Sequence, residues 1–380
     1  MAANPGLTVD MQVVNANELM TNTQTRLTAG DVDVVDVFAF SNALQPYMKN
    51  VDAPGWQSLI DAGLLMDITD EAFVANYDAA ATADAGSYNG RVYAINLGRV
   101  GFSGVYYNKD LFAANNVAVP TTWTELVAAC ETFTAAGIPC MTAGGKDGWP
   151  IFVGAYGLLG SAYPDQGALV EGLWNGSIKY TDQDWLDLLG KYQVYDRDMM
   201  EAGATGLAPD AAPGRFASGA VAMFPGGTWY GPAIEAAAPA FDWGYIPFPG
   251  SDDPADNQYM FGKYDQGWAI AADSPNKDAA VKYLTAFSEP EAYQAFVTAV
   301  GPIPTQPGAT LDTKIGKEIA PYLANFRVGF ELMWVAPKGA GQFASPAQNN
   351  LFAPFGTFED PAAAAAQAQA DLQAGLDAAQ

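Results

Sequence analysis

The most informative stretch of the sequence is Val32-Asp33-Val34-Val35-Asp36-Val37-Phe38, where four valines in seven residues predict a strand buried in a sheet. An earlier segment, Leu7–Val14, alternates apolar with polar residues and predicts another strand. Between them we expect a helix over about Leu19–Ala29 that ends at Gly30. Strand, helix and strand would form a βαβ unit with parallel strands and a right-handed crossover.

The residues just after this second strand are candidates for a binding loop. Ligands of α/β sheets bind beyond the carboxyl ends of the strands. Phe38 is followed there by Phe40, Ser41 and Asn42. We expect Phe40 and Asn42 to contact a ligand, with an ordinary loop role as the alternative.

Further along the chain, capping signals predict several helices. Thr122 and Glu125 form a capping box that opens a helix to about Ala136, before Gly137. Further helices are expected after Ser274-Pro275, from Ser288 to about Val300, and after Asp360-Pro361. Helices that alternate with strands along the whole chain predict an α/β fold.

The composition excludes several classes of partner. The chain of 380 residues carries a formal net charge of −25. A nucleic-acid-binding protein needs cations to neutralise phosphates, and an anionic membrane surface would repel this chain. The sequence lacks an apolar run of 18 residues, so it offers no candidate transmembrane helix. We expect a monomer kept soluble by its acidity.

The sequence contains no histidine and only two cysteines, Cys130 and Cys140. The usual catalytic triads and nearly all zinc enzymes are therefore excluded, and we expect no metal or other cofactor. Two readings of the cysteines stay open: a disulfide, which would suit an oxidising compartment, or two buried free thiols.

Three patches resemble one family, the extracellular solute-binding proteins of sugar importers of the ABC type (the maltodextrin-binding type). Their order and spacing, rather than any single motif, carry the resemblance. The patches are Tyr88–Ile95 with Val105–Phe112 and Pro120–Leu126, then Phe216–Phe224 with Gly226–Trp229, and finally Gly267–Ile270 with Ser274–Ala280 and Gly301–Pro304.

The resemblance implies a two-lobed α/β fold of the periplasmic-binding-protein type, with a hinge and an interlobe cleft that closes on the ligand. The N-terminal lobe would hold residues 1–105 and 262–306, and the C-terminal lobe residues 106–261 and 307–380. The family usually begins with a strand and a long helix that are not found here. The resemblance also implies an extracytoplasmic protein, a cell-surface lipoprotein or a periplasmic one, whose targeting segment is absent from this sequence.

Aromatic side chains are the strongest candidates for the binding site, because rings stack on the flat C–H faces of sugars. Trp229 follows Gly226-Gly227-Thr228 and matches the cleft tryptophan of the family. Tyr230 is its neighbour, and Trp149 lies in a glycine-rich polar loop before a predicted helix. For Trp229 and Tyr230 the alternative is a packing role in the core, and for Trp149 it is a packing role at the start of the helix.

The remaining candidates are weaker. Four hydrogen-bonding residues in a row, Lys263, Tyr264, Asp265 and Gln266, suit the recognition of hydroxyl groups, or form an ordinary solvated loop. The others are Trp56, which could instead pin its loop; Arg99, which could instead pair with a carboxylate; and Trp334 and Phe343, which lie where the late site aromatics of the family fall.

The leading hypothesis is therefore the substrate-binding subunit of an ABC transporter, which captures an oligosaccharide by lobe closure and delivers it to the transmembrane subunits of a permease without chemistry. Two alternatives stay open. One is a binding protein for another small solute, such as an amino acid, a peptide or a phosphorylated glycerol. The other is a glycoside hydrolase that uses two carboxylates, for which no motif isolates a pair.

Overall fold

The computed structural model describes residues 6–38 and 43–379, and within these it divides into two compact units. Unit 1 comprises the described parts of Met1–Leu44, Ala53–Val100 and Tyr264–Asp312. Unit 2 comprises Gln45–Asp52, Gly101–Lys263 and the described part of Thr313–Gln380. Each unit is described by itself, and the lobe boundaries expected from the sequence stay a prediction.

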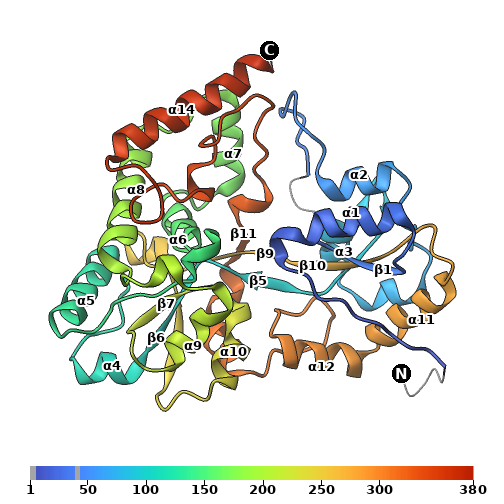
Figure 1. Cartoon of the computed structure of the whole chain (residues 1–380), viewed down its shortest axis with the longest axis horizontal. Helices are drawn as coiled ribbons and strands as arrows, with labels where there is room; N and C mark the ends of the chain where they lie inside the picture. Colours follow the sequence, from blue (N-terminus) through green and yellow to red (C-terminus); the bar gives the residue numbers. More distant parts are fainter. Residues whose placement is uncertain (1–5, 39–42, 380) are drawn as a thin grey trace. The chain divides into compact units, whose positions relative to one another are not determined.

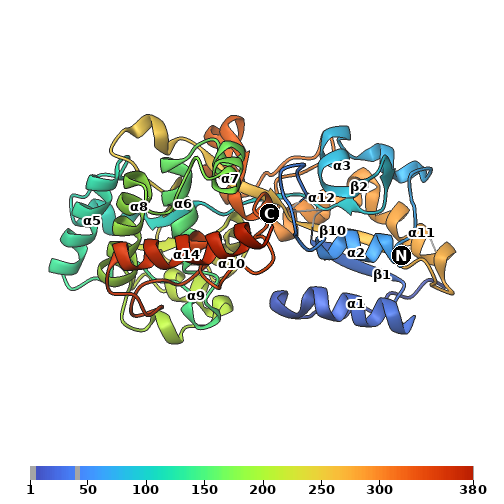
Figure 2. The same ribbon diagram turned by 90° about the horizontal axis from the view of Figure 1, so that it is seen from above.

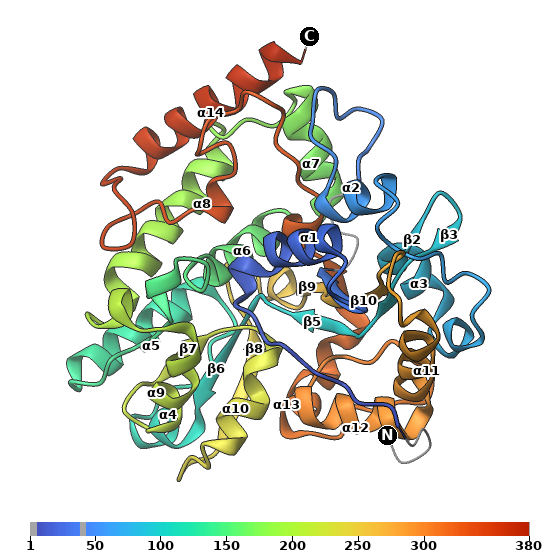
Figure 3. The ribbon, with the colours of Figure 1, turned by 45° about the vertical axis from the view of Figure 1, so that its right-hand side comes forward.

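Unit 1 is built on a three-stranded sheet with the order β1-β10-β4, in which both pairings are antiparallel. Its strands are β1 (Val34–Phe38), β10 (Gln266–Ile270) and β4 (Ile95–Asn96), and a small hairpin of β2 (Ser87–Tyr88) and β3 (Arg91–Val92) lies beside α3 (Figure 3). Its helices are α1 (Leu19–Ala29), α2 (Gly55–Asp61), α3 (Ala79–Gly86), α11 (Lys277–Ser288) and α12 (Pro290–Val300), with short 3-10 turns at Ala16–Glu18 and Ala72–Asn76.

Both faces of this sheet are covered by helices. Val35 and Val37 of β1 pack with residues of α1 and α2, including Leu27 and Trp56. On the other face, Ile270 of β10 packs with residues of α11 and α12, among them Leu284, Tyr293 and Val297. The burial of Val35 and Val37 explains why this stretch of sequence has the apolar composition of a buried strand.

The strand predicted over Leu7–Val14 is wrong, and so is the βαβ unit. This segment has no strand pairing, and the apolar residues at its alternate positions are exposed, Val9 at 36%, Met11 at 63% and Val13 at 90%. Arg26 of α1 donates to the side chain of Gln12 at 2.7 Å. The strand partner of β1 is β10, more than 200 residues later and antiparallel, a pairing that local patterns do not reveal.

Unit 2 contains an antiparallel sheet with the order β7-β6-β8, made of β7 (Met223–Pro225), β6 (Gly104–Asn108) and β8 (Trp243–Pro247). A parallel pair joins β9 (Met260–Tyr264) and β11 (Phe326–Val328), and β5 (Arg99–Gly101) and β9 carry the chain between the units. The helices are α4 (Lys109–Ala114), α5 (Trp123–Ala135), α6 (Phe152–Ala162), α7 (Gln166–Asn175), α8 (Gln183–Val194), α9 (Ala212–Ala217), α10 (Gly231–Ala236), α13 (Lys314–Ile319) and α14 (Pro361–Ala378).

Several helices of unit 2 begin and end where the sequence predicts. The Thr122 hydroxyl accepts from the Glu125 backbone N–H at 3.2 Å, while the Glu125 carboxylate accepts from the N–H of Thr121, and α5 is followed by Gly137 with a positive φ. Asp360 caps α14, which runs beside α8 in Figures 1 and 2. In unit 1, by contrast, α11 begins at Lys277 rather than at Pro275, because Ser274 and Pro275 form a turn in which the Ser274 hydroxyl donates to Asp33 at 2.6 Å.

Among the described residues, no helix combines the length and apolar character that a membrane crossing requires. The same residues hold no cluster of acidic or sulfur side chains that could bind a metal ion.

Candidate functional site

Two neighbouring loops of unit 2 leave its sheet at the same edge. The segment around Met141 lies parallel to β7: the Met223 N–H donates to the Cys140 carbonyl at 2.8 Å, and the Thr142 N–H donates to the Met223 carbonyl at 3.2 Å. Because the carboxyl ends of parallel segments meet at one edge, the loop that carries Trp149 and the loop that carries Trp229 are neighbours.

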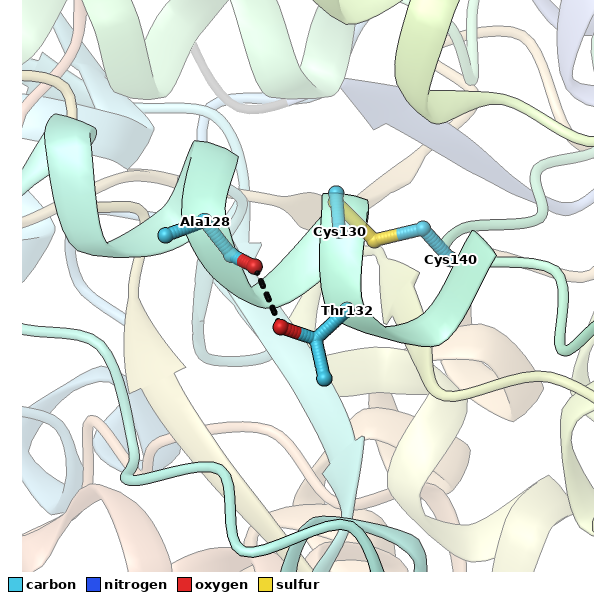
Figure 4. The surroundings of a disulfide bond; sticks show 4 residues. All are labelled: Ala128, Cys130, Thr132 and Cys140. Atoms are coloured by element: carbon cyan, nitrogen blue, oxygen red, sulfur yellow. Dashed lines mark hydrogen bonds between the residues drawn. A yellow bond between two sulfur atoms is a disulfide. The ribbon is translucent and has the colours of Figure 1, made fainter. Parts of the chain in front are cut away.

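The first segment is tied to α5 by a disulfide. Cys130 and Cys140 are bonded, with their Cα atoms 5.0 Å apart, and both side chains are buried (Figure 4). The bond lies one residue before Met141, so it fixes the start of the segment that leads to Trp149.

The loop Gly226-Gly227-Thr228-Trp229 is held from below by two buried tyrosines. The Tyr245 hydroxyl donates to the Gly226 carbonyl at 3.0 Å, and the Tyr106 hydroxyl donates to the Gly227 carbonyl at 2.9 Å. Burial is the largest cause that raises the pKa of both phenols, so both are neutral donors at physiological pH. The backbone of this loop is therefore fixed before any ligand arrives.

Gly227 is required because the indole of Trp229 folds back over it. A Cβ atom at Gly227 would lie 1.9 Å from a ring carbon of Trp229, well inside van der Waals contact. The backbone of Gly227 is extended, with φ −75° and ψ 163°, so the requirement is for space and not for a left-handed conformation.

The Trp149 loop also depends on close packing around glycine. Gly148 has a φ of 80°, which L side chains rarely adopt, and it directly precedes Trp149. A Cβ atom at Gly144 would lie 2.4 Å from the Cα atom of Pro209, and one at Gly145 would lie 2.7 Å from the Ala204 carbonyl. The loop is thus pressed against the segment 204–209, which positions the tryptophan at its end.

Partly exposed rings from these and nearby segments form what we call the aromatic platform: Trp149, Phe152, Trp229 and Tyr259. The rings of Trp149 and Trp229 have centroids 6.1 Å apart and planes inclined by 48°.

The platform rests on a second layer of buried rings. Phe102, Tyr156 and Phe261 are at most 4% exposed, and Phe152, Trp229 and Tyr259 pack against them. Close packing on this layer restricts how far the rings of Phe152, Trp229 and Tyr259 can tilt.

Polar groups accompany these rings. Lys263 and Glu331 form an ion pair with 3.5 Å between nitrogen and oxygen, and their side chains are 19% and 35% exposed. The guanidinium of Arg327 lies over the ring of Tyr259, 4.5 Å from its centroid. Apolar faces with a few charged groups nearby suit a ligand that has both C–H faces and hydroxyl groups.

Comparison with known proteins agrees with this description. The model of the family of bacterial extracellular solute-binding proteins matches residues 1–294 of the chain. The chain belongs to this family. Proteins of this family bind substrates and are not enzymes.

The relatives of this solute-binding protein include sugar-binding proteins. It is 27% identical over 305 residues to the multiple sugar-binding protein of Streptococcus mutans serotype c (strain ATCC 700610 / UA159), covering 78% of this chain and 68% of that protein.

Two solved structures are similar in fold over nearly the whole chain. The solute-binding protein RafE in complex with raffinose has a TM-score of 0.76 and 20% identity, covering 95% of this chain and 90% of the other. A chitin oligosaccharide binding protein has a TM-score of 0.77 and 18% identity, covering 100% and 93%. The fold is therefore the two-lobed α/β fold of solute-binding proteins.

Of the residues predicted from the sequence, the structure brings Trp149 and Trp229 together. Tyr230 is different: it is 7% exposed, and its ring packs on Phe224 with centroids 5.0 Å apart, so it supports the loop from inside. A binding role for any of these residues stays a prediction.

Lys263 lies in unit 2, whereas the other three residues of that row lie in unit 1. The Tyr264 hydroxyl lies 3.4 Å from a carboxylate oxygen of Asp84, and the N–H of Asp265 donates to the Gly98 carbonyl at 3.0 Å. Gln266 starts β10, and its carbonyl accepts from the N–H of Leu97 at 2.9 Å. The side chains of Tyr264, Asp265 and Gln266 are half-buried, and their role in the recognition of hydroxyl groups stays a prediction.

Arg99 of unit 1 is half-buried, and its backbone makes two hydrogen bonds of 2.8 Å with Ile303. Close to this part of unit 1, Asp36 of β1 is mostly buried. Burial, and next the charge of Asp265, raise the pKa of Asp36 to about 8. The sequence did not single out Asp36, because it reads as the polar position of an alternating strand.

Trp56, Trp334 and Phe343 lie in packed surroundings. Trp56 is 5% exposed in the core of unit 1, with its ring edge-on to Tyr88. Trp334 is 4% exposed and stacks on Phe330 with centroids 5.3 Å apart. Phe343 is half-buried against Phe358, and none of these three joins the aromatic platform. Phe40 and Asn42 lie outside the described residues.

Sequence reasoning missed Phe152, Tyr259 and Glu331. Phe152 and Tyr156 are four residues apart on α6, directly after the Trp149 loop, and this spacing could have placed both on one helix face. Tyr259 and Glu331 carried no such signal, because only the folded chain brings β9 next to β11.

Proposed function

We propose that this protein is the substrate-binding subunit of an ABC transporter and that it captures a neutral oligosaccharide on the aromatic platform. The single observation that carries the proposal is the pair of half-buried tryptophans, Trp149 and Trp229, whose ring centroids lie 6.1 Å apart and of which Trp229 packs on a buried aromatic layer. Such faces stack on the C–H surfaces of pyranose rings.

The comparisons support a sugar over other solutes. The curated relative is a multiple sugar-binding protein, and similar folds were solved with raffinose and with stachyose. The chain has 17 basic residues against 42 acidic ones, which disfavours a phosphorylated or otherwise anionic ligand.

The finer points of the proposal follow from this role. The protein would deliver the bound sugar to the transmembrane subunits of a permease. It would act outside the cytoplasm as a monomer, either in the periplasm or as a lipoprotein at the cell surface. Closure of the two lobes on the sugar stays part of the proposal. The protein would perform no catalysis, and incubation with an oligosaccharide mixture should yield no cleavage products.

A thermal-shift screen identifies the ligand class. We expect raffinose, stachyose or a chitin oligosaccharide to raise the melting temperature, because a ligand that binds only the folded state stabilises it. Amino acids, peptides and glycerol phosphate serve as the matched panel from the alternative solute classes. A shift with that panel alone would overturn the sugar assignment.

Trp229→Ala then tests the site. Removal of a stacking ring should weaken binding of the sugar about tenfold or more, measured by isothermal titration calorimetry. Trp229→Phe, which keeps an aromatic face, should retain more of the affinity. Wild-type affinity in Trp229→Ala would remove Trp229 from the site.

A further inference from the structure

The two tyrosines beneath the Trp229 loop are register partners on adjacent strands. Tyr106 of β6 and Tyr245 of β8 stand opposite each other, their ring centroids are 4.6 Å apart, and they are 0% and 1% exposed. The Tyr106 hydroxyl donates to the Gly227 carbonyl, and the Tyr245 hydroxyl donates to the Gly226 carbonyl.

The surroundings are built to admit these hydroxyls. A Cβ atom at Gly104 would lie 2.2 Å from the hydroxyl oxygen of Tyr245, so only glycine at that position lets this phenol reach the loop. The Gly104 carbonyl itself accepts from the N–H of Gly226 at 3.0 Å. The side chain of Thr228 accepts from the N–H of Gly101 at 3.1 Å, which fixes the next residue of the loop.

A core needs only apolar rings at these two positions, and phenylalanine would fill the same volume. Packing alone therefore does not explain why both positions hold a tyrosine whose hydroxyl donates to one of two consecutive carbonyls. One of these carbonyls belongs to Gly227, over which the indole of Trp229 lies with a ring carbon 1.9 Å from the Cβ position, and the other belongs to the residue before it. A shift of these peptide groups must therefore move the indole.

We infer that Tyr106 and Tyr245 are positioning residues for Trp229: their hydroxyls set the height and tilt of its indole relative to Trp149. The consequence for affinity rests on the proposed function, whereas the geometry of the indole pair can be measured without any ligand. Loss of the Tyr245 hydroxyl removes the donor to the Gly226 carbonyl. Loss of the Tyr106 hydroxyl leaves the Gly227 carbonyl with the N–H of Tyr230, at 3.1 Å, as its donor. Either change removes one contact that holds the peptide groups of the loop in place.

The test uses Tyr106→Phe and Tyr245→Phe in the full chain, with Tyr180→Phe as the matched control. Tyr180 is equally buried and its hydroxyl donates to a carbonyl, that of Ala344, at 2.7 Å. All three variants lose one buried hydrogen bond, and each should lower the melting temperature by about 2–4 °C. Stability alone therefore does not separate them.

Near-ultraviolet circular dichroism separates them. The indoles of Trp149 and Trp229 couple at 6.1 Å and 48°, and so do those of Trp174 and Trp334 at 6.5 Å and 50°. Each spectrum is therefore recorded with and without Trp229→Phe. The difference isolates the bands to which Trp229 contributes through its coupling to Trp149 and to Tyr230. We expect Tyr106→Phe and Tyr245→Phe to lose part of this difference band and Tyr180→Phe to retain it.

Affinity provides the second measurement. For whichever of raffinose, stachyose and a chitin oligosaccharide binds, the two positioning variants should bind at least about threefold more weakly, and this loss should vanish when Trp229→Ala is also present. A difference band identical to wild type in both variants overturns the inference, whether or not any sugar binds. A reduced band in a protein that binds none of the sugars would overturn the proposed function and leave the positioning role standing.

Discussion

Gly227→Ala displaces the indole of Trp229 without disturbing the backbone conformation. Alanine adopts the φ and ψ of Gly227 freely, so the effect is one of space alone. The new methyl group would start 1.9 Å from the indole, whereas ordinary contact begins at 3.4 Å, so the ring must retreat by about 1.5 Å. The Tyr106 hydroxyl donates to the Gly227 carbonyl at 2.9 Å, so we expect the ring to move rather than the peptide group.

A shift of this size changes the distance and angle between the indoles of Trp229 and Trp149. It also reduces the contact of Trp229 with the buried rings beneath it. We expect the variant to bind sugar about tenfold more weakly, as if most of the stacking were lost, and to be less stable by about 1–3 kcal/mol from overpacking. Calorimetric titration with the sugar found by the thermal-shift screen measures the affinity, and urea denaturation measures the free energy of unfolding.

Gly190→Ala is the control for this substitution. Gly190 lies in α8 with open space around its Cβ position, so alanine there should stabilise the helix by about 0.5–1 kcal/mol and leave sugar binding unchanged. If Gly227→Ala bound sugar as tightly as wild type, the indole would not be where binding occurs, or the loop would not be rigid, and the reasoning above would be refuted.

Two further predictions concern stability. Burial, followed by the charge of Asp265, raises the pKa of Asp36 from 3.8 to about 8, so the folded state binds this proton more tightly than the unfolded state. The stability contributed by that proton is complete below pH 3.8 and is lost as the pH rises to about 8. Asp36→Asn should therefore gain stability over wild type across this range, and parallel melting curves against pH for the two proteins would contradict it. Cys130→Ala with Cys140→Ala opens a bond that spans 10 residues and should lower the free energy of unfolding by about 2–3 kcal/mol. An unchanged urea midpoint, with wild-type protein in oxidising buffer as the reference, would show that the bond does not stabilise the fold.

Local signals in the sequence were sufficient for several helices and for strand β1 of unit 1. The capping box at Thr122 and Glu125 acts within one turn, and Val35 and Val37, two residues apart, form one buried face of the strand, so both signals are local in the sequence. The segment Leu7–Val14 shows the limit of such signals. Its alternation is that of a strand, yet a strand also needs a partner edge, and none pairs with this segment in the described part of the chain.

The site was predictable to a similar degree. Glycine next to tryptophan identified both loops, because close approach of a ring to a backbone is a local requirement, as Gly227 and Trp229 show. That the two loops are neighbours depends on the pairing of Met141 with β7, across some 80 residues of sequence. Lys263 and Glu331 meet through the packing of β9 with β11, which no spacing in the sequence records.

The separation between the half-buried indole of Trp229 and the buried phenols that hold its loop has a consequence for how such proteins diversify. The ring that we propose meets the ligand and the tyrosines that hold its loop lie on different strands and loops, so the ring can be exchanged while the tyrosines are retained. A single substitution at position 229 could change the preferred cargo of the transporter without a new fold, whereas substitutions at Tyr106 or Tyr245 would blur selectivity for every cargo alike.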